Sequence, residues 1–274
     1  MSDEEVTVAA PAHITGLFAA YPATDPLEAG SIGAGLALED GVVVTVDSTK
    51  TSGLFLDGDP TSMRAPALVL EAFDVDLHVE IDAQVPLGAG FGVSGAAALG
   101  VAHAVNDIVD AMMTENELVK LAHRADVEAG TGLGDVVAQA RGGVPLRLEP
   151  GAPGYGKMDG IPAQPTVEYT TMGELSTADV LKGDLARINT AGRAAMERVQ
   201  DRPTVDTFMT ESATFARESG LLDDEIAAII DRVDRPVSMA MLGRTVFGLD
   251  NALSAEGIDA RESRVSPAGV HYVD

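Results

Sequence analysis

Apolar and polar positions alternate in the first part of the chain, which predicts that it begins with β-strands. Residues 6–21 are expected to form one strand. Residues 33–38 and 42–47 are expected to form a hairpin that turns at 39–41. Residues 49–64 are polar and rich in Gly and Asp, so they are expected to form a loop.

The clearest alternation lies in residues 73–82, where Phe, Val, Leu and Ile alternate with acidic residues and His78. A period of two is typical of an antiparallel strand with one buried and one solvated face. His78 is therefore expected on the solvated face.

Helices are predicted to follow. Small residues indicate a helix over 94–113. The sequence Thr-Glu-Asn-Glu at 114–117 predicts a capping box that starts a second helix. That helix should run to about Ala129, where Gly130 ends it. A short helix is expected to start near Asp135.

The rest of the chain is predicted to be mostly helical. Gly and Pro are concentrated at 149–160, which suggests a domain boundary near 150–170. Helices are expected from about 173 to 233, then a strand or loop at 237–242. A short helix and a strand are expected in 252–274. This order of strands, helices, helices and strand indicates the α+β class.

Charge narrows the range of partners. The chain has 274 residues, with 18 Lys and Arg against 43 Asp and Glu, a net charge of -25. Nucleic acids and anionic membranes both attract basic surfaces, so neither is an expected partner. The acids are spread along the chain and only four of the cations are Lys. This composition suits a salt-rich cytoplasm, which predicts a halophilic source.

Other chemistry is excluded by residues that the chain lacks. It contains no Cys, so disulfides, thiolate metal sites and Cys nucleophiles are ruled out. The acidic first residues 1–5 do not resemble a signal peptide. No apolar run approaches the ~18 residues of a membrane span, so a cytoplasmic protein is expected.

The segment 86–97, a Gly-rich turn at 86–92 followed by the start of the predicted helix, carries the first chemical signal. Gly residues allow backbone N–H groups to approach an anion, and the following helix adds its positive N-terminal end. With few Lys residues, a phosphate site here would use backbone donors, with Ser94 as a hydroxyl ligand for phosphate or Mg²⁺. The alternative is a flexible turn before a closely packed helix.

Neither of two standard phosphate-binding motifs accounts well for this segment. A P-loop requires Gly-Lys-Ser/Thr, which the sequence does not contain. The dinucleotide pattern G-x-G-x-x-G is matched by Gly90, Gly92 and Gly95. That reading, a nicotinamide oxidoreductase, is disfavoured because the preceding strand alternates and a second helix, not a strand, follows.

Glu128 and Asp135 lie on either side of a second Gly-rich turn. One carboxylate can hold Mg²⁺ on phosphate oxygens, and the other can accept a proton from an attacking hydroxyl. The alternatives are an exposed last-turn residue for Glu128 and a helix N-cap for Asp135. Nearby, Arg141 and Arg147 could bind an anionic substrate through a bidentate fork or could form surface ion pairs.

The turn at 86–97 resembles the central motif of the GHMP kinases, roughly Pro-x-x-x-Gly-Leu-Gly-Ser-Ser-Ala-Ala. Phe91 replaces Leu, and one extra residue leaves Ser94 as the functional hydroxyl. Residues 11–18 and 30–35 resemble the archaeal branch of the superfamily that phosphorylates pantoate. Residues 238–243 stand where the third, Gly-rich motif of the superfamily is expected, although they retain a single Gly.

This resemblance implies a two-domain GHMP kinase fold. Residues 1–165 would form an ATP-binding domain like the second domain of ribosomal protein S5, and residues 166–274 a ferredoxin-like domain. It implies ATP-dependent phosphorylation of the primary hydroxyl of (R)-pantoate to 4-phosphopantoate, for coenzyme A synthesis. A GHMP kinase for mevalonate, homoserine or shikimate is the alternative, and a homodimer is possible.

The resemblance also implies roles for individual residues. Ser94 and Glu128 would coordinate Mg²⁺-ATP, and Asp135 would be the catalytic base. A cationic group must meet the substrate carboxylate, with Arg147 preferred over Arg141. The other expected contacts, for ATP and then for substrate, are Pro86, Gly88, Gly90, Gly92, Val93, Ser94, Gly95 and Ala96, and His13, Thr15 and Ser31.

Overall fold

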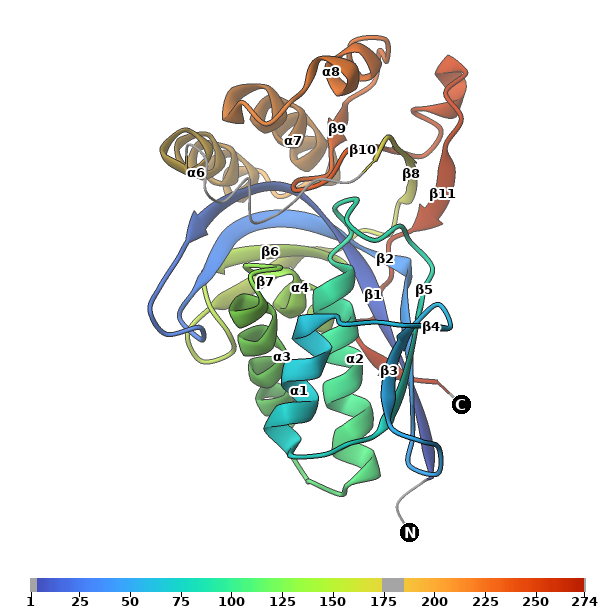
Figure 1. Cartoon of the computed structure of the whole chain (residues 1–274). Helices are drawn as coiled ribbons and strands as arrows, with labels where there is room; N and C mark the ends of the chain where they lie inside the picture. The colour runs from blue at the N-terminus through green and yellow to red at the C-terminus, as the bar shows by residue number, and fades with distance from the viewer. Residues whose placement is uncertain (1–3, 174–184, 274) are drawn as a thin grey trace.

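The computed structural model describes residues 4–173 and 185–273, which fold into two β-sheets with helices packed against them (Figure 1). The first sheet has the order β12-β1-β2-β5-β3-β4, with β6 paired to β2 and β7 to β6. The second has the order β11-β8-β10-β9. The predicted α+β class is confirmed.

The strands are β1 (Glu5–Tyr21), β2 (Gly30–Asp47), β3 (Gly53–Leu56), β4 (Asp59–Pro60), β5 (His78–Ala83), β6 (Val144–Glu149), β7 (Lys157–Ile161), β8 (Thr166–Thr171), β9 (Val237–Met239), β10 (Thr245–Leu249), β11 (Arg261–Arg264) and β12 (His271–Tyr272). The described helices are α1 (Arg64–Phe73), α2 (Val93–Ile108), α3 (Glu115–Ala129), α4 (Asp135–Arg141), α6 (Leu185–Asp201), α7 (Val205–Ser219), α8 (Asp224–Ile230) and the 3₁₀ turn η1 (Ser254–Glu256).

The long strands β1 and β2 pair along most of their length, so the hairpin predicted at 39–41 is wrong. β2 runs straight through these residues. Pro11 pairs with Gly41 and Ala12 with Leu38, so the residues between Leu38 and Gly41 form a bulge. Residues 33–38 and 42–47, predicted as the two strands of the hairpin, both pair with β1. They therefore belong to one continuous strand, and residues 39–41 do not form a turn.

Only the second half of the segment 73–82, which was predicted to be a strand, is one in the structure. Phe73 ends helix α1, and Asp74 caps it in the left-handed conformation at φ 56°. The strand β5 starts at His78 and pairs antiparallel with β2. Residues 49–64, expected to form a loop, contain β3 and β4, and β3 pairs in parallel with β5.

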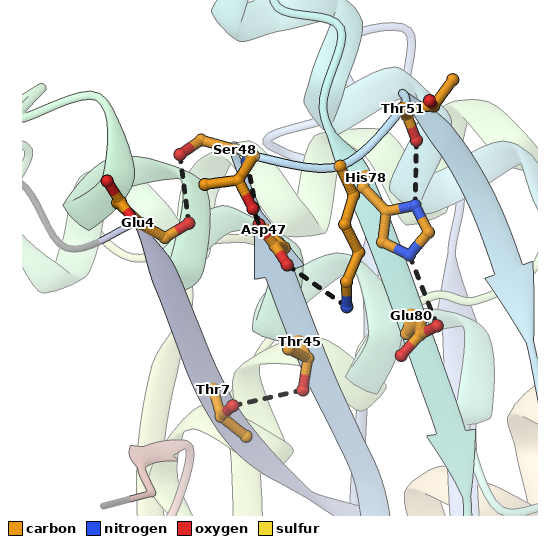
Figure 2. Close-up of polar contacts among 10 residues, drawn as sticks. Glu4, Thr7, Thr45, Asp47, Ser48, Thr51, His78 and Glu80 are labelled. Atoms are coloured by element: carbon orange, nitrogen blue, oxygen red, sulfur yellow. Dashed lines mark hydrogen bonds and ion pairs between the residues drawn. The ribbon is translucent and has the colours of Figure 1, made fainter.

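His78 does not lie on a freely solvated face. Its side chain is 13% exposed because the ring packs on Phe55, with ring centroids 4.9 Å apart. Figure 2 shows the ring between the Thr51 carbonyl and the Glu80 carboxylate, at 3.0 and 3.3 Å. Phe55 lies on β3 and Thr51 in the loop before it, which is why the local period did not reveal these two contacts, whereas Glu80 lies two residues further along β5.

Three helices in the first part of the chain were predicted: α2, which ends at Ile108 and not at 113, α3 and α4. Helix α1 was not predicted. Thr114 and Glu117 form the expected capping box at the start of α3, and Gly130 ends the helix at φ 71°. Helices α1, α2, α3 and α4 cover one face of the first sheet (Figure 1). Because β5 is antiparallel to β2 and α2 leads directly into α3, the doubly wound dinucleotide-binding fold is excluded.

The second part of the chain is helical up to α8, as predicted for the residues described; residues 174–184 lie outside them. Strand β9 and the short helical turn η1 match the expectations for 237–242 and 252–274, but the latter segment contains two strands, β11 and β12, where one was expected. Strands β8 and β10 were not predicted. The first sheet ends at Ile161 and the second begins at Thr166, but β12 returns to pair with β1.

Specific contacts connect the two sheets close to the Gly-rich turn. Phe91 packs edge-on against Tyr169 with ring centroids 4.9 Å apart. The Thr245 hydroxyl donates to the Ala89 carbonyl at 2.8 Å, and the Met241 amide donates to the Thr15 carbonyl at 2.9 Å. The turn is thus held from both sides. None of the helices in the described ranges is long and apolar enough to span a membrane.

Candidate active site

A cavity of about 890 Å³, including its open mouth, lies where the loops of the two sheets meet. It is bordered by β1, β2 and β6, by the Gly-rich turn with the start of α2, and by the turn before α4. The loop after β9 closes it from the second sheet. The lining residues are Thr15, Phe18, Ser31, Leu87, Gly88, Gly90, Phe91, Gly92, Val93, Ser94, Thr131, Leu133, Gly134, Asp135, Arg147, Met241 and Leu242.

The Gly-rich turn gives the cavity a wall of backbone. Gly90 and Gly92 have φ of 93° and 64°, a region that non-Gly residues rarely adopt, and Gly92 is the N-cap of α2. The first helical bond joins the Ala96 amide to the Gly92 carbonyl, so the preceding amides have no partner within the helix. Such a helix end attracts phosphate oxygens.

The ATP contacts expected from the sequence divide into two groups. Gly88, Gly90, Gly92, Val93 and Ser94 line the cavity. The other three do not line it: Gly95 and Ala96 are buried in α2, and Pro86 is half-buried ahead of the turn.

The single Gly of the third motif has a packing role. A Cβ at Gly243 would collide with the Ala89 carbonyl of the Gly-rich turn. The two loops can approach each other only because Gly243 has no side chain, and this brings Met241 and Leu242 to the edge of the cavity.

Ser94 belongs to a chain of hydrogen-bonded side chains that ends on Asp126, a residue that was not predicted from the sequence to be part of the site. Its hydroxyl donates to the Thr131 hydroxyl at 3.0 Å, which donates to Asp126 at 2.6 Å. Asp126 is 2% exposed. Burial raises the pKa of Asp126 to about 7, the nearby charge of Asp135 adds to this, and the hydroxyls of Thr131 and Ser94 oppose it.

Glu128 does not reach the cavity. It lies exposed on the last turn of α3, where Asp126 points inward. The two residues are about 200° apart around the helix, since each residue advances about 100°. The signal was present in the sequence: the buried face of α3 includes Leu118, Ala122 and Ala125, and Asp126 continues that face.

Asp135 is the first residue of α4 and about one fifth of its side chain is exposed. The N-cap of α4 is Gly134, so the N-cap reading of Asp135 is wrong. Its Oδ1 accepts hydrogen bonds from His13 Nδ1 at 2.7 Å and from the Thr15 hydroxyl at 3.4 Å. Burial raises the pKa of Asp135, but the bond and charge of His13, the charge of Arg147 and the Thr15 hydroxyl together lower it. The carboxylate is thus held ionised.

The three expected substrate contacts on the first two strands differ in position. Thr15 and Ser31 line the cavity. His13 is fully buried on β1 and lies behind Asp135, so the structure does not bring it to the cavity surface.

Of the two arginines, only Arg147 reaches the cavity. It is 3% exposed on β6, and its Nη1 donates to the Gly134 carbonyl at 3.4 Å. Its Nε has no partner, and no ion pair between described residues includes it. Burial lowers the pKa of Arg147, while the charge of Asp135 opposes this. A buried guanidinium without a carboxylate partner is costly unless an anion meets it.

Arg141 ends α4 on the surface, outside the cavity. Its guanidinium donates to the Gly142 carbonyl at 3.2 Å and packs against Gly160. The structure therefore separates the two arginines that the sequence had left as alternatives.

Comparison with known proteins agrees with this geometry. Residues 62–143 match the family model of the GHMP kinases N terminal domain. The pantoate kinase of Thermococcus kodakarensis is 35% identical over 266 residues, covering 90% of this chain and 88% of that protein. A solved phosphotransferase related to the CoA biosynthesis pathway has a TM-score of 0.84 and 29% identity, with 98% of each chain covered. MDDEF in complex with MVAPP, AMPPCP and magnesium shares the fold at a TM-score of 0.68 and 14% identity, covering 98% of this chain and 99% of that one.

The fold and the family model define the chain as a kinase of the GHMP type. Since the Thermococcus relative is similar over most of both chains, the chain belongs to the pantoate kinase family of phosphotransferases.

Proposed function

We propose that this protein transfers the γ-phosphoryl group of ATP to the primary hydroxyl of (R)-pantoate and forms 4-phosphopantoate. The observation that carries this proposal is that one cavity is lined both by Asp135 and by Arg147, a buried cation with no carboxylate partner in the described ranges. The cavity therefore offers one group for a substrate carboxylate and one for a substrate hydroxyl, and pantoate has both. The relatives compared above act in the same chemistry, according to their names.

In the proposed reaction, the Gly-rich turn and the start of α2 bind the phosphates through backbone amides. Arg147 binds the substrate carboxylate, with Ser31 and Thr15 beside it. Asp135 accepts the proton of the attacking hydroxyl while the new O–P bond forms and the bond to ADP breaks. Phosphoryl transfer depends mainly on such positioning and on electrostatic stabilisation.

The described residues fit a bound Mg²⁺. They contain no group of three metal-ligating His, Asp or Glu side chains, so a cation would need oxygens of the nucleotide as well. The hydroxyls of Ser94 and Thr131 line the cavity next to the helix end and would offer hard oxygen ligands, and the buried Asp126 carboxylate behind them accepts a hydrogen bond from Thr131. When bound, Mg²⁺ would neutralise charge on the transferred phosphoryl group.

The function is tested by ADP release from the purified protein with Mg²⁺-ATP in molar KCl. Pantoate, mevalonate, homoserine and shikimate are offered in parallel. We expect turnover with pantoate alone. Turnover with another of these alcohols would support the kinase activity and contradict pantoate as the substrate. No turnover with any of the four in folded protein would contradict the proposed kinase activity itself.

Asp126→Asn is expected to raise the Mg²⁺ concentration needed for half-maximal activity by about 10-fold or more, because the carboxylate that orients the Thr131 and Ser94 hydroxyls is lost. Glu128→Gln is the matched control, since it removes a carboxylate two residues away that lies outside the cavity. Titration of activity with Mg²⁺ at fixed ATP measures both. The opposite result, a large effect at Glu128 and none at Asp126, would restore the assignment made from the sequence.

We also propose that the chain divides into two domains near residue 165.

A further proposal is that the protein is adapted to high salt in the cytoplasm of a halophilic archaeon. The net charge of -25 supports this adaptation. The expected result is a Tm that rises with KCl, because the screening length falls from about 10 Å at 0.1 M to about 3 Å at 1 M. Thermal unfolding in KCl and in choline chloride of equal ionic strength measures it. The same Tm in dilute buffer and in molar salt would exclude the adaptation.

A further inference from the structure

His13 contacts Asp135 from the side opposite the cavity. Its ring is fully buried on β1, and its Nδ1 lies 2.7 Å from Asp135 Oδ1. The cavity wall includes Asp135 and Thr15 but not His13. The same Nδ1 lies 3.3 Å from the Thr15 hydroxyl, so any effect of His13 on a bound substrate must pass through Asp135 or Thr15.

The other ring nitrogen defines the protonation state. Nε2 has no hydrogen-bond partner among the residues that the structure describes and faces Gly35, where any Cβ would collide with it. A proton on Nε2 would be a buried donor without an acceptor. A bare Nδ1 would place its lone pair against a carboxylate oxygen. The ring is therefore neutral and carries its single proton on Nδ1.

The charged surroundings of the pair are consistent with this state. Burial lowers the pKa of His13, the bond and charge of Asp135 on α4 oppose this, and the charge of Arg147 on β6 adds to it. Asp135 also faces Asp126 on α3 and Arg147.

We propose that His13 is a positioning residue that holds Oδ1 of Asp135 through its Nδ1–H group and leaves Oδ2 to accept the proton of the substrate hydroxyl. The inference rests on the proposed kinase function. The proton moves from the hydroxyl to Oδ2 as the O–P bond forms and the γ-phosphoryl group leaves ADP. His13 keeps its own proton throughout, because Nε2 has no partner in the described part of the chain through which a proton could leave. His13 thus orients the Asp135 carboxylate and takes no part in proton transfer.

Two substitutions separate a donor from a space-filling ring. In His13→Asn, the amide nitrogen stands near the position of Nδ1 and can still donate to Asp135. In His13→Leu, a side chain of comparable size offers no donor. We expect His13→Leu to lower kcat by about 10- to 100-fold, the loss typical of one hydrogen bond to a charged group. We expect His13→Asn to recover most of that loss.

The pH profile gives a readout that a packing role would not change. The bond from His13 lowers the pKa of Asp135, so its removal should raise that pKa. The acidic limb of kcat should therefore move to higher pH in His13→Leu and stay close to the wild type in His13→Asn. The KM for pantoate should change little in either variant, because His13 does not line the cavity.

Several results would overturn the inference. Equal kcat values and unmoved acidic limbs in the Asn and Leu variants would reduce His13 to packing. A change in the pantoate KM as the main effect would make it a substrate contact. If His13→Leu does not fold, His13→Gln replaces it, since its longer amide cannot place a donor at Nδ1 and should behave as Leu does. Wild-type protein that is inactive with pantoate would instead refute the proposed function.

Discussion

Asp135→Asn is expected to lower kcat by about 10²- to 10⁴-fold, the usual contribution of a positioned general base. The amide keeps the size of the side chain and can still accept a hydrogen bond from His13 through its oxygen. It cannot accept the proton of the substrate hydroxyl. ATP binding should be almost unchanged, because the nucleotide phosphates are expected at the Gly-rich turn. Steady-state kinetics and a nucleotide titration of the same preparation measure the two effects.

Asp224→Asn is the matched control, because Asp224 is also the first residue of a seven-residue helix but is exposed on α8. It should behave like the wild type in both measurements. Turnover of Asp135→Asn close to the wild-type value would remove Asp135 from the role of base.

We expect the reaction to lose activity at low pH and not at neutral pH, because the surroundings of Asp135 lower the pKa of its carboxyl group. Its pKa is lowered in the folded protein, so the carboxylate is ionised at neutral pH and activity is lost only as the pH falls through that lowered value. The same shift stabilises the folded state above the ordinary pKa of an aspartate, and this stabilisation disappears in acid.

Local signals in the sequence predicted local structure correctly. The Thr-Glu-Asn-Glu capping box, the Gly130 terminator and the short helix near Asp135 depend on interactions within a few residues, and all are present. The hairpin at 39–41 failed because pairing of β2 with β1 decides whether those residues turn. Such pairing connects residues far apart in the chain.

The same division applies to the site. The Gly-rich turn, Ser94 and Asp135 could be selected from motifs, and the cavity unites them. The choice between Glu128 and Asp126 depends on which side of α3 faces the sheet, and a spacing counted along the chain does not give that direction. The position of His13 behind Asp135 joins residues 122 positions apart and has no sequence signal.

Arg147→Met is expected to raise the KM for pantoate by about 30-fold or more, because truncating one partner of a buried charge pair costs about 2 kcal/mol or more. The KM for ATP should change little. Arg147 lies in the cavity wall with no carboxylate partner among the described side chains, so the unliganded protein should not be destabilised by losing this charge. Its Tm without substrate should stay at or above the wild-type value, while the Tm increase caused by pantoate should disappear.

Arg141→Met is the matched control for this change. It removes the same side chain six residues away, outside the cavity, and should leave the pantoate KM within about 2-fold of the wild type, as expected for a surface site. The amide of pantoate completes the test, since it keeps the hydroxyl and lacks the carboxylate. If Arg147 meets the carboxylate, the amide should be a poor substrate for the wild type, and Arg147→Met should weaken its binding little further. Equal losses for pantoate and its amide would show that Arg147 acts on another part of the site, and the substrate carboxylate would then need a different partner.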